Sequence, residues 1–436
     1  MRRYSTRREL MSLSTQPYKG ARDFYPEDKR IQKFMFNKIR GIVESYGYQE
    51  YDAPILESLD LYTAKSGEEI VNEQTYQFED RGGRRVAIRP EMTPTVSRMV
   101  AAKRQELAYP LRWYSIPNLW RYERPQRGRL REHWQLNVDV FGLDNASAEV
   151  ELMLVASDIL KGFGAEESMF EFRVNSRKLI DRIMESYLKL DDNTTHDLIK
   201  LIDRKNKLPL EQFSEQLKSI VGNKKEQVLQ LLGIDQLDDL PEEISDNVSV
   251  KNLKYLIESL NKAGVKNVVF DMSLMRGFDY YTGIVFEVFD TNPINNRAMF
   301  GGGRYDGLVG LFGVEPVATV GFGMGDVTLQ NFLEANDLVP VLTPETDLIL
   351  AGLTEDLASI VQLATQLRNK GINVAVDSSG RKIDRIIKSA SKANIQYITF
   401  IGDQELETKK FGLKNLNTGE SEVMSVNGII NKLKKK

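Results

Sequence analysis

The clearest signal in this chain is the segment Met275-Arg276-Gly277-Phe278-Asp279-Tyr280-Tyr281-Thr282-Gly283, which runs directly into Ile284-Val285-Phe286-Glu287-Val288-Phe289. It places a cation, an acid and two phenols between glycines, just before an apolar run typical of a strand. Buried donors and acceptors need partners, so a strand that begins with this many polar groups is expected to face a cavity. The alternative is an ordinary turn whose tyrosines pack against a sheet, because tyrosine is common in strands.

A second glycine-rich segment follows at Gly301-Gly302-Gly303-Arg304-Tyr305-Asp306-Gly307. The two segments together resemble the histidine-specific boxes of histidyl-tRNA synthetases, which are class II aminoacyl-tRNA synthetases. The resemblance implies that Arg276 is a catalytic arginine against the α-phosphate of ATP. It also implies that Tyr280 and Tyr281 line the histidine pocket, with Tyr281 near the imidazole. The glycines at 301–303 would let the backbone approach the ligand closely, since they have no Cβ atom.

Near the start of the chain, residues 27–46 have apolar side chains at helical spacing, and Gly47 supplies a C-terminal stop. A strand that ends at Pro54 is expected next. An ordinary amphipathic core helix explains the pattern. The unit also resembles class II motif 1, which forms much of the dimer interface in the family. The order of the motifs favours the interface, and therefore a homodimer.

Residues 86–89 have the pattern of a strand and run into Pro90-Glu91-Met92-Thr93-Pro94. Thr93 is suited to cap a helix predicted over 94–108, with the second proline in its first turn. Ligand-facing groups commonly project from such a strand-to-helix junction, although a Glu beside a helix start is also common on surfaces. In the family, the residues that correspond to Glu91 and Thr93 hold the α-amino end of histidine.

Arginine is concentrated in residues 111–131, where six arginines accompany one acid, Glu123. The turn Pro125-Gln126-Arg127-Gly128 between strand-like segments predicts a hairpin with a basic loop. Clustered guanidinium groups repel one another unless anions neutralise them, so a triphosphate is a better explanation than a solvated loop. The segment resembles class II motif 2. This implies Arg121 at the α-phosphate, Glu123 and Arg129 around ATP, and a loop tip near the acceptor end of tRNA.

The next predicted strand, Trp134–Gly142, alternates in side-chain direction, so that Gln135, Asn137 and Asp139 share one face. Three polar side chains on one face of a central strand need a ligand or solvent on that side. Gln135 and Asp139 match the histidine-binding positions of the family. Many bacterial relatives have Glu at the Asp139 position, and the shorter acid remains available to pair with the imidazole ring.

The segment Gly321-Phe322-Gly323-Met324-Gly325-Asp326-Val327-Thr328-Leu329 occupies the place of class II motif 3. Its glycines and a helix predicted over 329–335 fit that motif, and the resemblance implies a role for Gly323 in ATP binding. Most members of the family have an ATP-clamping arginine where this chain has Thr328. The departure leaves open which group contacts the adenine and the γ-phosphate.

The character of the chain changes twice. Residues 176–262 become helical and polar, which predicts a helical insertion. In the family such an insertion contacts the acceptor arm of tRNA, although its lysines can equally be solvated charge. Beyond Pro340, strands and helices alternate, with Thr354 as a candidate helix cap. This pattern predicts a separate α/β domain with a mainly parallel sheet, and it resembles the anticodon-binding domain of several class II synthetases.

Composition limits the chemistry that is available. A length of 436 residues predicts two or three domains. The absence of cysteine excludes disulfides, thiol nucleophiles and cysteine–zinc sites, so catalysis must use carboxylates, arginines, phenols or backbone groups. Net charge is only −3, so a nucleic-acid partner has to be argued from local patches. No apolar run approaches the roughly 20 residues that span a bilayer.

The first residues, 1–15, are basic and contain Ser and Thr, which is faintly similar to a transit peptide. An amphipathic continuation is missing, and Met11 could equally be the initiator. We interpret this segment as a disordered extension and expect a cytoplasmic protein. The catalytic core is expected over 16–175 and 263–338, the helical insertion over 176–262, and the C-terminal domain over 339–436.

These patterns predict a histidine–tRNA ligase, with an α+β catalytic domain built on an antiparallel class II sheet, a helical insertion and a C-terminal α/β anticodon-binding domain. Its substrates would be L-histidine, ATP with Mg²⁺, and tRNA(His). One alternative is a catalytically inactive, synthetase-like regulatory subunit of ATP phosphoribosyltransferase. Only Thr328 favours that alternative, whereas the tyrosine segment, Arg121 and the C-terminal domain oppose it. Another is a class II synthetase for glycine, proline or threonine, which the segment 275–283 argues against.

Overall fold

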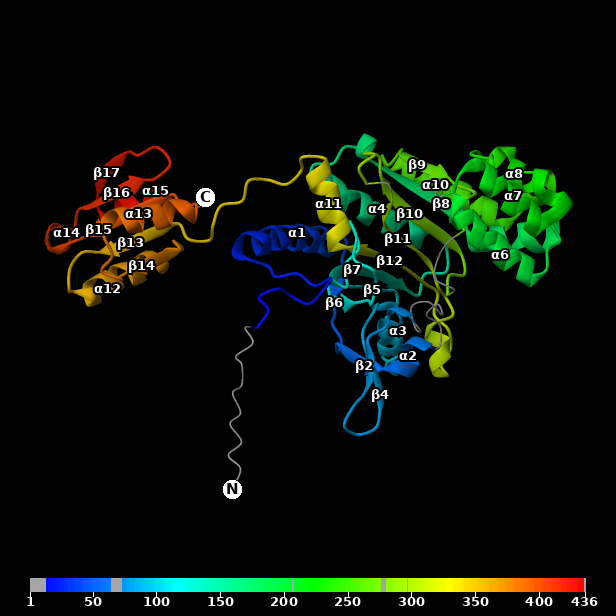
Figure 1. Cartoon of the computed structure of the whole chain (residues 1–436), viewed down its shortest axis with the longest axis horizontal. Coiled ribbons are helices and arrows are strands. Elements are labelled where there is room, and N and C mark those ends of the chain that lie inside the picture. Colours follow the sequence, from blue (N-terminus) through cyan, green and yellow to red (C-terminus); the bar gives the residue numbers. More distant parts are fainter. Residues whose placement is uncertain (1–12, 64–72, 206–207, 276–279, 296, 435–436) are drawn as a thin grey trace, which may run out of the picture. The chain divides into compact units, whose positions relative to one another are not determined.

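The computed structural model describes residues 13–63, 73–205, 208–275, 280–295 and 297–434. The predicted catalytic Arg276 lies outside these residues, as does most of the predicted extension at 1–15. Two compact units form: Met1–Asp23 with Gln32–Val339, and Phe24–Ile31 with Pro340–Lys436. Figure 1 labels most of the helices and strands of each unit.

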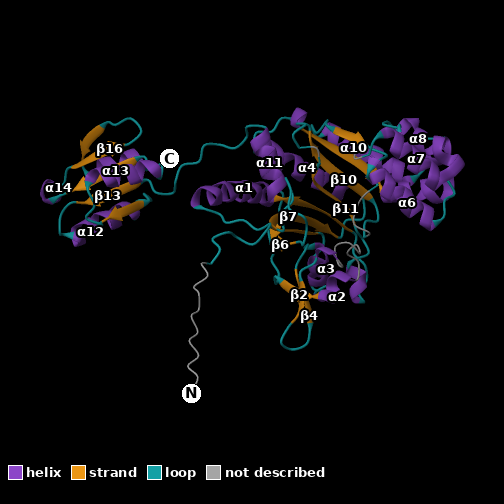
Figure 2. Ribbon diagram, viewed as in Figure 1, coloured by secondary structure: helices purple, strands orange, loops and turns teal. Residues whose placement is uncertain are grey.

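A nine-stranded sheet of the described residues organises the larger unit (Figures 1 and 2). Its order is β1-β5-β7-β12-β11-β10-β8-β9, and β6 pairs with β7. The pairings are antiparallel except for β1 with β5 and β8 with β9. This confirms the predicted antiparallel sheet. The strands are β1 (Gln49–Glu50), β5 (Leu111–Ser115), β6 (Asn118–Trp120), β7 (Glu132–Phe141), β8 (Phe170–Ser176), β9 (Val268–Phe270), β10 (Ile284–Asp290), β11 (Ala298–Arg304) and β12 (Thr319–Gly325).

Helices and a small second sheet accompany the nine strands. The second sheet has the order β2-β4-β3, and its Ala87 is fully buried against Leu59 and Tyr62 of α2. The elements are α1 (Pro26–Ser45, which belongs to this unit from Gln32 on), β2 (Leu56–Ser58), α2 (Leu59–Thr63), β3 (Gln77–Glu79), β4 (Arg85–Ile88), α3 (Thr93–Ala102), α4 (Ser147–Gly162) and α11 (Asp326–Ala335). No helix formed by the described residues is long and apolar enough to cross a membrane.

The start of α3 differs from the prediction. The helix begins at Thr93, its N-cap is Met92, and no side chain caps it, so the expected cap at Thr93 is wrong. The Thr93 side chain instead lies near the Tyr280 hydroxyl, where it opposes the rise in the pKa of that group. The helix also ends at Ala102, earlier than the predicted 108.

A helical segment follows β8, as predicted, and Figure 2 shows it as a group of purple helices. Its last helix, α10, packs against α4 and β8. The apolar spacing seen in the sequence forms the interior, with fully buried side chains such as Leu198, Leu217 and Leu253. The helices are α5 (Arg177–Arg182), η3 (Ile183–Tyr187), α6 (Asp192–Asp203), α7 (Leu210–Val221), η5 (Gly222–Lys224), α8 (Lys225–Leu232), η6 (Leu237–Asp239), α9 (Glu242–Ser245) and α10 (Val248–Lys262).

The smaller unit has its own five-stranded sheet, in the order β14-β13-β15-β16-β17. Apolar residues of α12 and α15 form one core cluster with residues of the strands, and apolar residues of α13 form a second core cluster with them. The elements are β13 (Leu348–Gly352), α12 (Leu357–Arg368), β14 (Val374–Asp377), α13 (Ile383–Lys392), β15 (Tyr397–Ile401), α14 (Asp403–Thr408), β16 (Phe411–Asn415), β17 (Ser421–Met424) and α15 (Val426–Leu433). The predicted α/β class is confirmed.

Two details of this unit were predicted wrongly. The sheet is mixed, because β14-β13-β15 are parallel while β15-β16-β17 are antiparallel. The hairpin β16-β17 therefore extends the parallel part of the sheet, and the sheet as a whole is not mainly parallel. The cap of α12 is Asp356, which accepts a hydrogen bond from Ser359 N at 3.0 Å, and not Thr354.

Candidate active site

One face of β7 is matched by glycines on the neighbouring strand β12. A Cβ atom on Gly321 would lie 2.1 Å from Asp139 Oδ1, and one on Gly323 would lie 2.9 Å from Gln135 Nε2. Only residues without a side chain leave room for polar groups at these positions. The opposed pairs are Gln135 with Gly325, Asn137 with Gly323, and Asp139 with Gly321.

Asp139 is buried, with 4% of its surface exposed. The Tyr305 hydroxyl, also buried, donates a hydrogen bond to Asp139 Oδ1. Burial raises the pKa of Asp139 to about 7, and the hydrogen bond from Tyr305 opposes that rise. The carboxyl group can therefore change its charge near neutral pH. Tyr305 was not predicted as a site residue, although it lies in the second glycine-rich segment.

Three tyrosines and a glutamate form a cluster beside Asp139, in which Tyr280, Tyr305 and Glu91 are buried and Tyr281 is partly buried. The ring of Tyr280 lies 5.2 Å from that of Tyr281 and 5.7 Å from that of Tyr305, between centroids. Tyr280 Oη donates a hydrogen bond to Glu91 Oε2 at 3.2 Å. Burial and the charge of Glu91 raise the pKa of Tyr280 well above its usual range, so its hydroxyl remains a neutral donor.

Tyr281 lies over the second glycine-rich segment. A Cβ atom on Gly303 would approach its ring to 3.0 Å, so the absence of a side chain there lets the ring lie against the strand. Burial, followed by the charge of Glu91, raises the pKa of the Tyr281 hydroxyl above its usual range. The structure thus brings Glu91, Thr93, Asp139, Tyr280 and Tyr281 together.

Arg121, which is predicted to bind ATP, hydrogen-bonds to the strand-to-helix junction that contains Glu91. Arg121 Nε donates a hydrogen bond to Pro90 O at 2.9 Å. In the loop that follows, Arg129 forms an ion pair with Glu123 at 2.8 Å, in which the glutamate side chain is 7% exposed. The two predicted ATP-binding residues of this loop therefore pair with each other and neutralise part of its charge.

His133 lies at the end of the polar β7 face that is nearest to Arg121, Arg22 and Arg129, which we call the arginine end. It shares that face with Gln135 and Asp139, because side chains alternate along a strand. Burial, followed by the charges of Arg121, Arg22 and Arg129, lowers the pKa of His133 to about 3. Its ring is therefore neutral, and its buried Nδ1 has no hydrogen-bond partner among the described residues. Sequence reasoning missed His133.

The first turn of α11 closes the arginine end. Asp326 pairs with Arg22 at 2.7 Å and accepts a hydrogen bond from Trp134 N at 3.0 Å. Thr328 Oγ1 donates to Met299 O at 2.7 Å, so its hydroxyl is engaged with the backbone. The helix begins at Asp326, three residues before the predicted start at 329. Asp326 and Arg22 were also missed by sequence reasoning.

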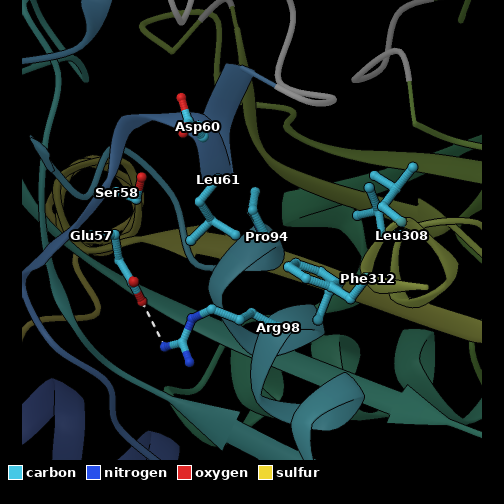
Figure 3. Close-up of a pocket in the computed structure, with 10 residues that line it drawn as sticks. Glu57, Ser58, Asp60, Leu61, Pro94, Arg98, Leu308 and Phe312 are labelled. Atoms are coloured by element: carbon cyan, nitrogen blue, oxygen red, sulfur yellow. Dashed lines mark hydrogen bonds and ion pairs between the residues drawn. The ribbon is translucent and has the colours of Figure 1, made fainter. Parts of the chain in front are cut away.

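A separate apolar cavity of about 330 Å³ lies between α2, α3 and the turn at Val309–Phe312 (Figure 3). Its rim includes the ion pair between Arg98 and Glu57, at 2.7 Å. Leu308 lines this cavity and also packs in the tyrosine cluster. None of the predicted site residues lines it, so the cavity does not coincide with the candidate site.

Comparison with known proteins identifies both parts of the chain. Residues 20–329 match the family model described as histidyl-tRNA synthetase, and residues 348–436 match one described as an anticodon binding domain. A histidine–tRNA ligase from Leptospira biflexa is 43% identical over 429 residues, which is 97% of this chain and 98% of that protein.

Solved structures have the same fold. A histidyl-tRNA synthetase from Nostoc superposes with a TM-score of 0.81 at 23% identity, over 97% of this chain and 99% of that one. A Bacillus halodurans protein, titled an ATP phosphoribosyltransferase regulatory subunit/histidyl-tRNA synthetase, gives a TM-score of 0.73 at 23% identity, over 89% of this chain and 98% of that one. Because the family model spans most of the sequence and the Leptospira relative covers nearly all of it, the chain belongs to the histidyl-tRNA synthetase family.

Proposed function

We propose that this chain is a histidine–tRNA ligase that activates L-histidine with ATP and then transfers histidine to the 3′ end of tRNA(His). The observation that carries the proposal is the polar face of β7. Its acid end, at Asp139, adjoins the tyrosine cluster, and its other end, at His133, adjoins the arginines. The two residues are six positions apart, or about 20 Å along the strand. That length suits histidine and ATP placed end to end.

Histidine would lie at the acid end. The carboxylate of Glu91 suits the α-amino group, and Thr93 and Gln135 provide polar contacts around it. Asp139 would accept a hydrogen bond from the imidazole, and Tyr281 would lie beside the ring. A pocket built to satisfy polar ring atoms strongly rejects amino acids that lack them, because its own buried groups would be left without partners.

Activation is a displacement at phosphorus. A carboxylate oxygen of histidine attacks the α-phosphorus of ATP, the bond to the β-phosphate oxygen breaks, and pyrophosphate leaves. The protein has little covalent chemistry to perform, so positioning and charge stabilisation dominate. We assign Arg121 and Arg276 to the α-phosphate, and Glu123, Arg129 and Gly323 to the rest of ATP. The assignment of Arg276 rests on the family resemblance alone.

Magnesium would arrive with ATP. Among the described residues, no group of three or more His, Asp or Glu side chains is arranged to hold a metal ion. A hard cation such as Mg²⁺ binds phosphate oxygens well and keeps several waters, so the triphosphate itself is its best ligand here. Glu123 is already paired with Arg129.

Transfer would follow at the same site. The terminal ribose hydroxyl of tRNA attacks the carbonyl carbon of the adenylate, and AMP leaves with the bonding electrons. We assign this chemistry to residues 16–175 and 263–338, acceptor-arm contact to 176–262, and anticodon contact to 339–436. The match of residues 348–436 to an anticodon binding domain supports the last assignment. We also propose a homodimer, with α1 and the strand after it at the interface.

The regulatory-subunit alternative is not better supported. A solved structure whose title mentions such a subunit shares the fold at 23% identity, which says nothing of activity. The test is to charge total tRNA with each of a panel of radiolabelled amino acids. Histidine alone should be incorporated, on a tRNA that translates histidine codons. Incorporation of another amino acid, or of none, would overturn the proposal.

A further inference from the structure

Asn175, the residue before the end of β8, is fully buried and holds the loop that leads into the segment 275–283. Its Nδ2 donates hydrogen bonds to Asp271 O at 3.2 Å, Leu274 O at 3.2 Å and, more weakly, Met272 O at 3.5 Å. Its Oδ1 accepts from Ser176 N at 2.8 Å. Both polar atoms of the amide therefore bond to the backbone.

The loop that Asn175 holds is also ordered from within. Asp271 Oδ1 accepts hydrogen bonds from Ser273 N at 2.8 Å and Ser273 Oγ at 2.6 Å. Asp271 Oδ2 pairs with Arg173 Nη1 at 3.3 Å, and Arg173 is also on β8. Two side chains of one strand therefore anchor the turn that immediately precedes the segment.

The other end of the segment is held by the same part of the chain. Arg177 N, at the start of α5, donates a hydrogen bond to Gly283 O at 2.8 Å. The strands continue the contact, since Asn175 pairs with Val285, and Ser176 with Ile284. Three consecutive residues, 175–177, therefore fix both flanks of the segment 275–283 at the point where the helical segment begins.

We propose that Asn175 is a positioning residue for histidine activation. It does not touch the reacting atoms, but it fixes the backbone at 271–274, and the residues next to it, Ser176 and Arg177, fix Ile284 and Gly283, which follow Tyr280 and Tyr281 closely in the chain. Those tyrosines must meet Glu91, in the junction between β4 and α3, and Asp139, on β7. A misplacement of about 1 Å far from the chemistry can lower a rate about 10²-fold. The inference rests on the proposed function for its catalytic consequence.

The chain offers a matched control in Asn267. Its Nδ2 also donates to backbone carbonyls, Phe170 O at 2.6 Å and Glu167 O at 3.2 Å. These carbonyls are at the opposite end of β8, away from the segment 275–283. Asn267→Ala removes the same kind of interaction from the same part of the sheet, so it reports the cost in stability without the proposed effect on the site.

The experiment compares Asn175→Ala, Asn175→Ser and Asn267→Ala in the full-length protein. Thermal unfolding is followed by circular dichroism, and histidine-dependent pyrophosphate exchange is measured well below the lowest midpoint. Both alanine variants should lose stability. Only Asn175→Ala should lose about 10²-fold in kcat/KM for histidine, and Asn175→Ser, which keeps one donor, should recover part of it. Equal losses in the two alanine variants would overturn the proposal.

Hydrogen exchange read by mass spectrometry gives a second measurement that needs no activity. Asn175→Ala should speed exchange of the backbone amides at 271–275 and 280–283, while Asn267→Ala should leave them unchanged. Unchanged exchange in Asn175→Ala would overturn the positioning role. A wild-type protein that exchanges pyrophosphate with no amino acid would instead refute the proposed function, and the exchange data would still decide the role of Asn175.

Discussion

The Tyr280 hydroxyl donates a hydrogen bond to Glu91 Oε2 at 3.2 Å, although 189 positions separate the two residues in the chain. Both are buried, at 5% and 3% exposure, so the contact lies in a low-dielectric environment. An ionised group buried there must be paired or hydrogen-bonded. The tyrosine supplies one such partner to Glu91, and we infer that the ammonium group of histidine supplies another.

Glu91→Gln tests this pairing, because the amide oxygen can still accept from Tyr280 while the negative charge is lost. A hydrogen bond to a charged group is worth about 1.5–3 kcal/mol, so KM for histidine should rise about 10–100-fold. KM for ATP should stay near the wild-type value. Pyrophosphate exchange with each substrate varied in turn measures both. A rise in KM for ATP alone would show that Glu91 acts on ATP and not on histidine.

Asp139 should make stability depend on pH in a defined direction. Burial raises the pKa of its carboxyl from 3.8 to about 7, so the folded protein holds the proton more tightly than the unfolded chain does. The stability that this proton contributes is complete below pH 3.8 and is lost as pH rises through about 7. Asp139→Asn is neutral throughout and avoids that loss.

The stability advantage of Asp139→Asn over wild type should therefore grow between about pH 4 and pH 7, by up to about 1.4 kcal/mol per pH unit, and then level off. Urea unfolding at a series of pH values measures it. The same variant should bind histidine more weakly at pH 8, where the wild-type acid is ionised. A stability difference that does not change with pH would contradict the burial of an ionisable Asp139.

Gly321→Ala tests the glycine-lined face of the site. Its Cβ would lie 2.1 Å from Asp139 Oδ1 and 3.0 Å from Val138 O, so the carboxyl group must move. We expect kcat/KM for histidine to fall about 10²-fold, with about 1–3 kcal/mol lost in stability. Gly307→Ala is the control, since a Cβ there would meet nothing within 4 Å. Equal activities in the two variants would show that activity does not depend on the position of the Asp139 carboxyl group.

Arg121→Ala should lower histidine-dependent pyrophosphate exchange about 10²–10³-fold, because one preorganised charge at the α-phosphate is removed. Arg276→Ala should do the same. Arg124→Ala, in the exposed part of the same loop, should leave the exchange rate within about twofold of wild type. Comparable losses in Arg121→Ala and Arg124→Ala would indicate a general effect of loop charge and not a contact with the reacting phosphate.

Local patterns predicted those parts of the site whose signal lies within one element. Side-chain alternation put Gln135 and Asp139 on one face of β7, and this is confirmed by the register with β12. The glycines at 321, 323 and 325 were a second signal for the same face. They recur at every second position, which identifies the strand that pairs with the polar positions of β7.

Residues whose role depends on a distant partner could not be predicted. Tyr305 and Asn175 have no local pattern that announces a hydrogen bond to Asp139 or to the loop at 271–274. Thr93 looked like a helix cap because its local sequence suits one, but the helix already begins at Thr93 and its N-cap is Met92. The edge strand β17 was missed because its residues, Ser421–Met424, are largely exposed and half polar.

The central claim is that the tyrosine cluster, Glu91 and Asp139 form a histidine pocket joined to an ATP site. The most direct test is ATP–pyrophosphate exchange by the purified protein with each of the twenty amino acids. We predict exchange with histidine and background rates with glycine, proline and threonine. Exchange driven by one of those three instead, or no exchange with histidine, would contradict the account.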